Sequence, residues 1–277
     1  MENSDAAAKG KRVRDCFWLW GHEAGAHNNG WALPGLSRMT PVEAGFYMGV
    51  PRVIMVRYDD KPAPPYGQYA LPFTALEEVV WSIVGAAGTT GSEERQATLD
   101  LRNTLPRMSG VMMDDFFKNA APTTPDGLAV LSVEELRQVR AQLAGGGRPL
   151  DLWVVLYDHQ LALPVGDHLA QCDKVSFWTW KAVDLKDLEQ NFAKVEALAP
   201  AAGKVLGCYM WDYGQGKPMP IDWMEAQCEL GLRWLREGRI EGMIFLATCI
   251  GDLGLETVEW TRAWIARVGG ERLVSAR

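Results

Sequence analysis

Eight short, nearly continuous apolar runs recur along this chain, and they constrain its fold more than any other feature. They span residues 16–20, 53–58, 80–85, 110–113, 152–157, 174–178, 205–211 and 242–248. Because the runs do not alternate apolar with polar residues, they indicate parallel strands with both faces buried. The sequence therefore predicts a parallel sheet of eight strands.

Helix signals lie between most of these runs. Ser132 with Glu135, and Thr40 with Glu43, have the spacing of capping boxes, and Pro41 suits a first helical position. Segments 185–198 and 255–268 repeat apolar residues at the spacing of one buried helix face. Segment 163–172 has room for only a short helix.

Eight strand-helix units in series predict a closed (β/α)8 barrel, the TIM barrel fold, as a single α/β domain. Parallel strands need crossovers, and right-handed crossovers curl the sheet in one direction. We expect residues 1–12 to be a flexible N-terminal segment and residues 13–277 to form the barrel. An open doubly wound sheet is disfavoured, since neither GxGxxG nor GxxxxGK[ST] follows the first strand.

Composition is that of an ordinary globular protein, with 48% hydrophobic and 23% charged residues. No apolar run approaches the roughly 20 residues that span a bilayer. The amino-terminal residues lack the apolar core of a signal peptide, so we expect a cytoplasmic protein. A secreted protein whose signal peptide had been removed would read the same. The five cysteines include no CxxC pair, and we expect no disulfide and no structural zinc.

The net charge of −7 argues against nucleic acid and anionic membranes as partners, because both select basic surfaces. A neutral or cationic ligand fits this charge better, and we expect no cofactor. The oligomeric state stays open between monomer and homodimer, since amphipathic barrel helices look alike with or without a partner.

The fourth run ends in two adjacent carboxylates, Asp114 and Asp115. At a buried strand end, desolvation and like-charge repulsion raise the pKa of at least one of the two. Proteins make general acids for neutral pH in this way. The alternative interpretation is that one Asp caps a turn and the other is solvated.

Other runs also end in polar or aromatic residues, and a barrel gathers these strand ends around one cavity. The candidates for ligand binding are Trp18, Trp20, His22, Glu23, Asp59, Tyr157, Asp158, Trp178, Trp180, Trp211, Asp212 and Tyr213. Aromatic faces pack against the C–H faces of sugars, while carboxylates accept hydrogen bonds from hydroxyls. Any single Trp could equally be a packing residue.

His22, Glu23 and His27 also permit a metal interpretation. Their spacing is not that of HExxH, so other strands would have to supply the remaining ligands. The interpretation without a metal is the one we favour.

Three segments in order resemble the barrel of glycoside hydrolase family 84, the retaining β-N-acetylglucosaminidases. They are Asp114-Asp115 after the fourth strand, Trp178-Thr179-Trp180 after the sixth, and Trp211-Asp212-Tyr213 after the seventh. The family has "DD", "WTG" and "WDN" at these places. Here Trp180 replaces the Gly and Tyr213 replaces the Asn.

The resemblance implies a role for each matching residue. Asp114 would polarise the acetamido group of the substrate, whose oxygen attacks the anomeric carbon, and Asp115 would protonate the leaving oxygen. Asp212 would bind sugar hydroxyls, and Trp178 and Trp211 would shape the pocket. Such substrate-assisted chemistry needs no enzyme nucleophile.

We therefore expect the barrel to be the catalytic domain of a metal-free glycoside hydrolase that acts on a neutral or N-acetylated sugar. If the substrate has no N-acetyl group, Asp158 or Asp212 would serve as base or nucleophile. Two other functions stay open. One is a non-catalytic carbohydrate-binding barrel, and the other is a metal-dependent hydrolase that uses His22, Glu23 and His27.

Overall fold

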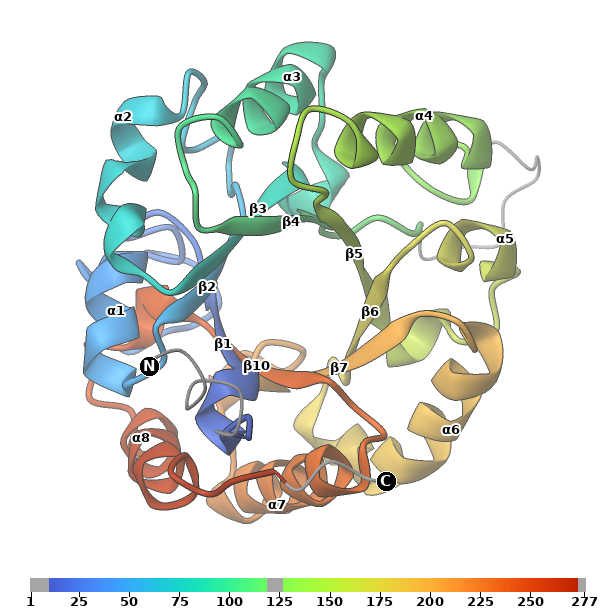
Figure 1. Ribbon diagram of the computed structural model, residues 1–277. Coiled ribbons are helices and arrows are strands. Elements are labelled where there is room, and N and C mark those ends of the chain that lie inside the picture. Colours follow the sequence, from blue (N-terminus) through green and yellow to red (C-terminus); the bar gives the residue numbers. More distant parts are fainter. Residues whose placement is uncertain (1–9, 119–126, 274–277) are drawn as a thin grey trace, which may run out of the picture.

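The computed structural model describes residues 10–118 and 127–273. Within them, eight parallel strands close into a barrel, and helices surround it on the outside (Figure 1). The order around the barrel is β1, β2, β3, β4, β5, β6, β7 and β10, with β10 pairing back to β1. This confirms the predicted (β/α)8 barrel.

The barrel strands follow the predicted runs closely. Their bounds are β1 Phe17–Gly21, β2 Arg52–Met55, β3 Glu78–Val84, β4 Met108–Met113, β5 Asp151–Tyr157, β6 Lys174–Trp178, β7 Gly203–Tyr209 and β10 Gly242–Leu246. The run at 205–211 does not form one strand. It breaks at Met210, and Trp211–Asp212 (β8) pairs antiparallel with Lys217–Pro218 (β9).

A helix follows each barrel strand. The helices are α1 Pro41–Met48, α2 Gly67–Ala70, α3 Ser92–Leu101, α4 Val133–Ala144, α5 Gly166–Leu169, α6 Leu188–Leu198, α7 Ile221–Glu237 and α8 Glu256–Val268. The predicted capping boxes at Thr40 and Ser132 are both present, and α5 is as short as expected.

The barrel interior is filled with tryptophan side chains. Trp18 packs edge-on against Trp153 at a ring-centroid distance of 5.3 Å. One layer nearer the carboxyl ends of the strands, Trp20 packs in the same way against Trp178, also at 5.3 Å. Gly207 on β7 makes room for Trp178, because a Cβ atom there would lie 2.0 Å from the indole ring. The interior is therefore a packed core and not a channel.

The amino-terminal residues 1–9, part of the segment expected to be flexible, lie outside the described residues. The backbone of Arg12 forms a bridge with that of Arg272, and its N–H donates to Asp15 Oδ2 at 2.8 Å. In the described parts of the chain, all five cysteines are buried and unpaired. None of the helices described there is long and apolar enough to cross a bilayer.

Candidate functional site

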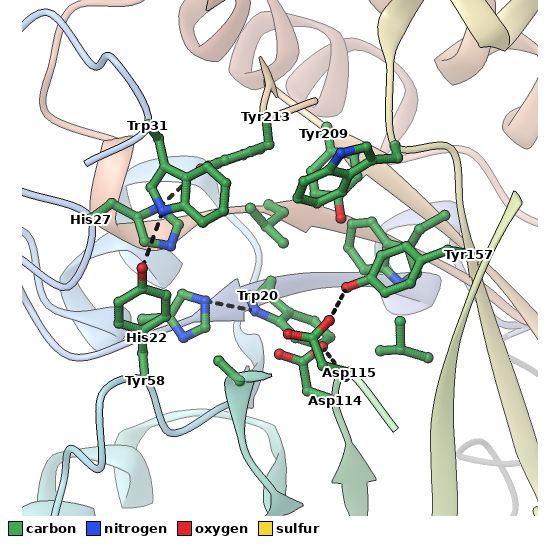
Figure 2. Close-up of a pocket in the computed structure, with 15 residues that line it drawn as sticks. Trp20, His22, His27, Trp31, Tyr58, Asp114, Asp115, Tyr157, Tyr209 and Tyr213 are labelled. Carbon is green, nitrogen blue, oxygen red and sulfur yellow. Dashed lines mark hydrogen bonds between the residues drawn. The ribbon is translucent and has the colours of Figure 1, made fainter. Parts of the chain in front are cut away.

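The carboxyl ends of the strands enclose a pocket of about 80 Å³ that opens to solvent. Its aromatic lining comprises Trp20, Trp31, Tyr58, Tyr157, Trp178, Trp180, Tyr209 and Tyr213. His22, His27, Asp114 and Asp115 complete its polar lining. Figure 2 shows the two carboxylates on one side of the pocket, with His22, His27 and Tyr58 on the other. We call this cavity the inner pocket.

Strand β4 and its first loop residues position the carboxylate pair. The N–H of Asp114 donates to Val84 O at 3.1 Å, which extends the pairing of β3 with β4 by one residue. Asp115 then turns into the left-handed region at φ 45°, and its N–H donates to Asp114 Oδ1 at 2.9 Å. A non-glycine residue held in this region is strained, a feature that clusters at functional sites.

Both oxygens of Asp115 accept hydrogen bonds. Tyr157 donates its hydroxyl to Oδ1 at 2.9 Å, and the Ala87 N–H donates to Oδ2 at 2.7 Å. Gly88 lets the β3–α3 loop approach this closely, since a Cβ there would lie 3.0 Å from Asp115 O. The carboxylate is thus held between β5 and the loop after β3.

Burial makes Asp114 harder to ionise. Asp114 is 5% exposed, and burial followed by the charge of Asp115 raises its pKa well above the ordinary value for Asp. Burial likewise raises the pKa of Tyr157 well above its usual value, so this hydroxyl stays protonated as a donor to Asp115. The raised pKa favours the protonated form of Asp114 in the folded protein.

Both ring nitrogens of His22 form hydrogen bonds within the protein. Nδ1 lies 2.9 Å from Val56 O, which can only accept, so Nδ1 carries the proton. Nε2 accepts from the Trp20 indole N–H at 3.0 Å. Burial lowers the pKa of His22 to about 4, so the ring is neutral at pH 7.

His27 is neutral for the same physical reason. Its Nδ1 lies 3.1 Å from the Tyr213 hydroxyl, and burial followed by the proximity of His22 lowers its pKa to about 2. Among the residues that the structure describes, no group of three or more His, Cys, Asp or Glu side chains is arranged to hold a metal. With both His22 nitrogens occupied, the metal set of His22, Glu23 and His27 is not assembled here.

The loop after β1 closes one side of the inner pocket. Trp31 donates its indole N–H to the Tyr58 hydroxyl at 3.3 Å, and its carbonyl accepts from the Trp211 indole at 3.0 Å. Asn28 and Ser37 exchange two hydrogen bonds, at 3.0 and 2.8 Å, across the same loop. These contacts fix the aromatic wall without a ligand.

The structure brings together most of the candidate residues from the sequence. Those on the inner pocket are Trp20, His22, Asp114, Asp115, Tyr157, Trp178, Trp180 and Tyr213. Asp158 lines a neighbouring groove that also contacts Asp115. The candidates that line neither cavity are Trp18, Glu23, Asp59, Trp211 and Asp212.

Packing explains where these other candidates lie. Trp18 lies one layer deeper in the barrel than the pocket, where it packs against Trp153. Trp211 supports the pocket wall from behind through Trp31 O. Asp212 is fully buried in the β8–β9 hairpin, where its Oδ1 accepts from Gln215 N at 3.1 Å. Asp59 is exposed at the surface.

The set of candidate residues omitted several of the pocket residues. Tyr209 lies on β7 two residues after the inward-facing Gly207, so strand alternation could have identified it. Tyr58 follows the second run and belongs to the same class of strand-end residues. Trp31 lies inside a long loop, and the Ala87 donor is a backbone group, so neither has a sequence signal.

No protein-family model matches this sequence, and no curated protein sequence matches it. The resemblance to glycoside hydrolase family 84 therefore has no support from sequence comparison beyond the three short segments. Among solved structures, the chain is similar to an FMN-binding β-glucuronidase from Facaelibacterium prausnitzii L2-6, with 10% identity and a TM-score of 0.48. That match covers 87% of this chain and 38% of the glucuronidase chain.

A second similar structure is from the tryptophan synthase α2β2 complex of the hyperthermophile Pyrococcus furiosus. Identity is 9% and the TM-score is 0.45, with coverage of 94% of this chain and 98% of the other. Similarity at this level carries no information on substrate or reaction.

Proposed function

We propose that this protein is a glycoside hydrolase that cleaves the glycosidic bond of a neutral or N-acetylated sugar. The observation that carries the proposal is the carboxylate pair on an aromatic pocket: Asp114 is buried with a raised pKa, and Asp115 is its neighbour on the pocket wall. A carboxyl whose pKa is raised keeps its proton closer to neutral pH, where it can serve a leaving oxygen.

The chemistry of the pocket favours an uncharged ring. Its aromatic side chains offer faces for C–H groups, and its hydroxyls and carboxylates offer partners for sugar hydroxyls. Among the described residues, neither Lys nor Arg lines the pocket, and the low pKa values of His22 and His27 keep both rings neutral. An anionic sugar would meet no counter-charge there.

The positions of the two acids support different roles. Asp114 lies deeper and would contact the sugar, accepting a hydrogen bond from the acetamido N–H of an N-acetylated substrate. Asp115 also lines two outer cavities and would face the leaving group. With substrate bound, Asp114 would be ionised and Asp115 would carry the proton, which would pass to the glycosidic oxygen as the bond from that oxygen to the anomeric carbon breaks.

In this scheme the acetamido oxygen forms the new bond to the anomeric carbon. A water molecule then attacks that carbon, gives its proton to Asp115 and reopens the acetamido group. Asp212, to which the family resemblance assigns the sugar hydroxyls, is not part of this proposal because it is fully buried away from the pocket.

The test is a panel of aryl α- and β-glycosides, including N-acetylglucosaminide and N-acetylgalactosaminide, with the wild type and Asp115→Asn. We expect the variant to lose about 10²- to 10⁴-fold in kcat on substrates with poor leaving groups, and much less on dinitrophenyl glycosides. An acid is needed least where the leaving group is already stable. The matched control is Asp100→Asn, on the exposed surface of α3.

Each other outcome has a defined meaning. Turnover by Asp115→Asn equal to that of the wild type on every leaving group contradicts the acid role. Sugar binding without turnover identifies a carbohydrate-binding barrel. Activity that a chelator abolishes and the substitution does not would identify a metal-dependent hydrolase.

A further inference from the structure

A second cavity, which we call the outer groove, lies beside the inner pocket. It has a volume of about 460 Å³ and opens to solvent. The segments that follow β5 and β6 form it, and its own lining residues are Asp158, His159, Lys181 and Asp184. Nothing in the chemistry proposed above uses these four residues.

The outer groove and the inner pocket share three residues, Asp115, Tyr157 and Trp180. These side chains therefore stand where one cavity passes into the other. Tyr157 donates to Asp115 at 2.9 Å, so the hydroxyl and the carboxylate mark this junction together. A ligand that fills the inner pocket and continues past Asp115 enters the groove.

We propose that the outer groove binds the leaving-group sugar, so that the natural substrate is a disaccharide or a longer chain and not a sugar on a small aglycone. This inference rests on the proposed hydrolase function and adds the second half of the substrate. The scissile oxygen would lie beside Asp115, with one sugar on each side.

The groove carries an aromatic surface suited to a sugar ring. His159 stacks on Tyr157 with the rings 9° from parallel and their centroids 5.3 Å apart. The His159 side chain is 39% exposed, so its ring remains accessible along the groove. Trp180 stands nearly perpendicular to Tyr157, at 79° and 5.8 Å. Such faces pack against the C–H face of a pyranose.

Asp158 holds this surface in place. Its Oδ1 accepts from the backbone N–H of His159 at 2.9 Å and from that of Trp180 at 3.4 Å. It thereby ties the segment after β5 to the segment after β6, and its side chain is only 10% exposed. The groove is therefore formed before a ligand binds, which lowers the entropic cost of binding.

The charges along the groove also restrict its ligand. Besides Asp115, which carries the proton in the proposed reaction, two carboxylates, Asp158 and Asp184, outnumber the one ammonium group, that of Lys181. A uronic acid or a sulfated sugar would be repelled here. A neutral or amine-bearing sugar is the class that fits.

The experiment compares two substrates with the same inner sugar, an aryl monoglycoside and a disaccharide. Both are measured with wild type, His159→Ala and His159→Phe. We expect His159→Ala to lower the ratio of disaccharide to aryl kcat/KM by about tenfold, mainly through KM, because it removes a stacking face. His159→Phe should restore the ratio, since it returns an aromatic face without the imidazole.

Lys186→Ala, an exposed position outside the groove, is the matched control. A ratio that stays at the wild-type value in His159→Ala, while both substrates still depend on Asp115, overturns the groove assignment and leaves the hydrolase intact. If neither substrate is turned over, the hydrolase itself fails and the leaving-group site fails with it.

Discussion

Asp114 lies in the inner pocket at a cost in stability. Its carboxyl is buried beside a second carboxyl, and its pKa is raised well above the unfolded value. A raised pKa means that the folded state favours the protonated form, so its contribution to stability is present at low pH. That contribution is lost as pH rises from the unfolded pKa toward the folded one.

Asp114→Asn should therefore stabilise the protein at pH 7 while lowering its activity. The amide keeps an oxygen that can accept from Asp115 N–H, and it removes the cost of a buried, repelled carboxylate. We expect the free energy of unfolding to rise by about 1 kcal/mol, measured by urea denaturation. At pH 3 the difference should vanish, and a variant less stable than wild type at pH 7 would contradict this account.

The individual candidate residues were predictable only in part. Asp114, Asp115, Tyr157 and Trp178 follow directly from the rule that barrel strands end at the active face. Trp18 looked equivalent to Trp20, yet it lies one layer below it. The two residues share an inward face, and depth along the barrel axis alone decides which reaches the pocket.

At the level of elements, strand and helix positions were set by local pattern. The capping boxes at Thr40 and Ser132 begin α1 and α4 as predicted, because their hydrogen bonds form within four residues. The break at Met210 was not predicted. A continuous apolar run carries no mark of where β7 leaves the barrel and the β8–β9 hairpin begins.

A substitution at Gly207 would test whether the tryptophan side chains in the barrel interior position β7. A Cβ at this place would lie 2.0 Å from the Trp178 ring, and the ring is fixed by its indole hydrogen bond to Ser176 Oγ at 3.1 Å. Gly207→Ala should therefore lower the free energy of unfolding by about 1–3 kcal/mol. It should also reduce activity, because Trp178 lines the inner pocket.

Gly67→Ala in α2 is the matched control for that substitution. No atom lies within 4 Å of a Cβ built there, so stability should be unchanged or slightly higher. Equal melting temperatures for Gly207→Ala and wild type would show that β7 tolerates the methyl group by moving.

For the whole molecule, the buried histidines make stability depend on pH. The unfolded chain protonates its histidines near pH 6.5, whereas the pKa values of His22 and His27 in the folded chain are about 4 and about 2. Between pH 6.5 and 4 the unfolded state thus binds more protons. The free energy of unfolding must fall as the pH is lowered through this window.

The corresponding measurement is urea denaturation of wild type and His27→Gln at pH 7 and pH 5. Each neutral buried histidine should cost about 2 kcal/mol of stability on acidification to pH 5. The variant carries one such group fewer, so its loss between the two pH values should be smaller by that amount. The same loss in both proteins would show that His27 is protonated in the folded state.

Local patterns in the sequence were enough to predict the barrel and the face on which polar residues gather. These patterns are buried strands, capped helices, and the constant direction of parallel strands. Which of those residues meet depends on contacts formed when the barrel closes. Trp18 lies too deep in the barrel to line the inner pocket, and Asp212 is buried in the β8–β9 hairpin. Trp31, which lines the pocket, comes from the long loop after β1. Contacts between segments far apart in the chain leave no local pattern, so they appear only when the strands have closed.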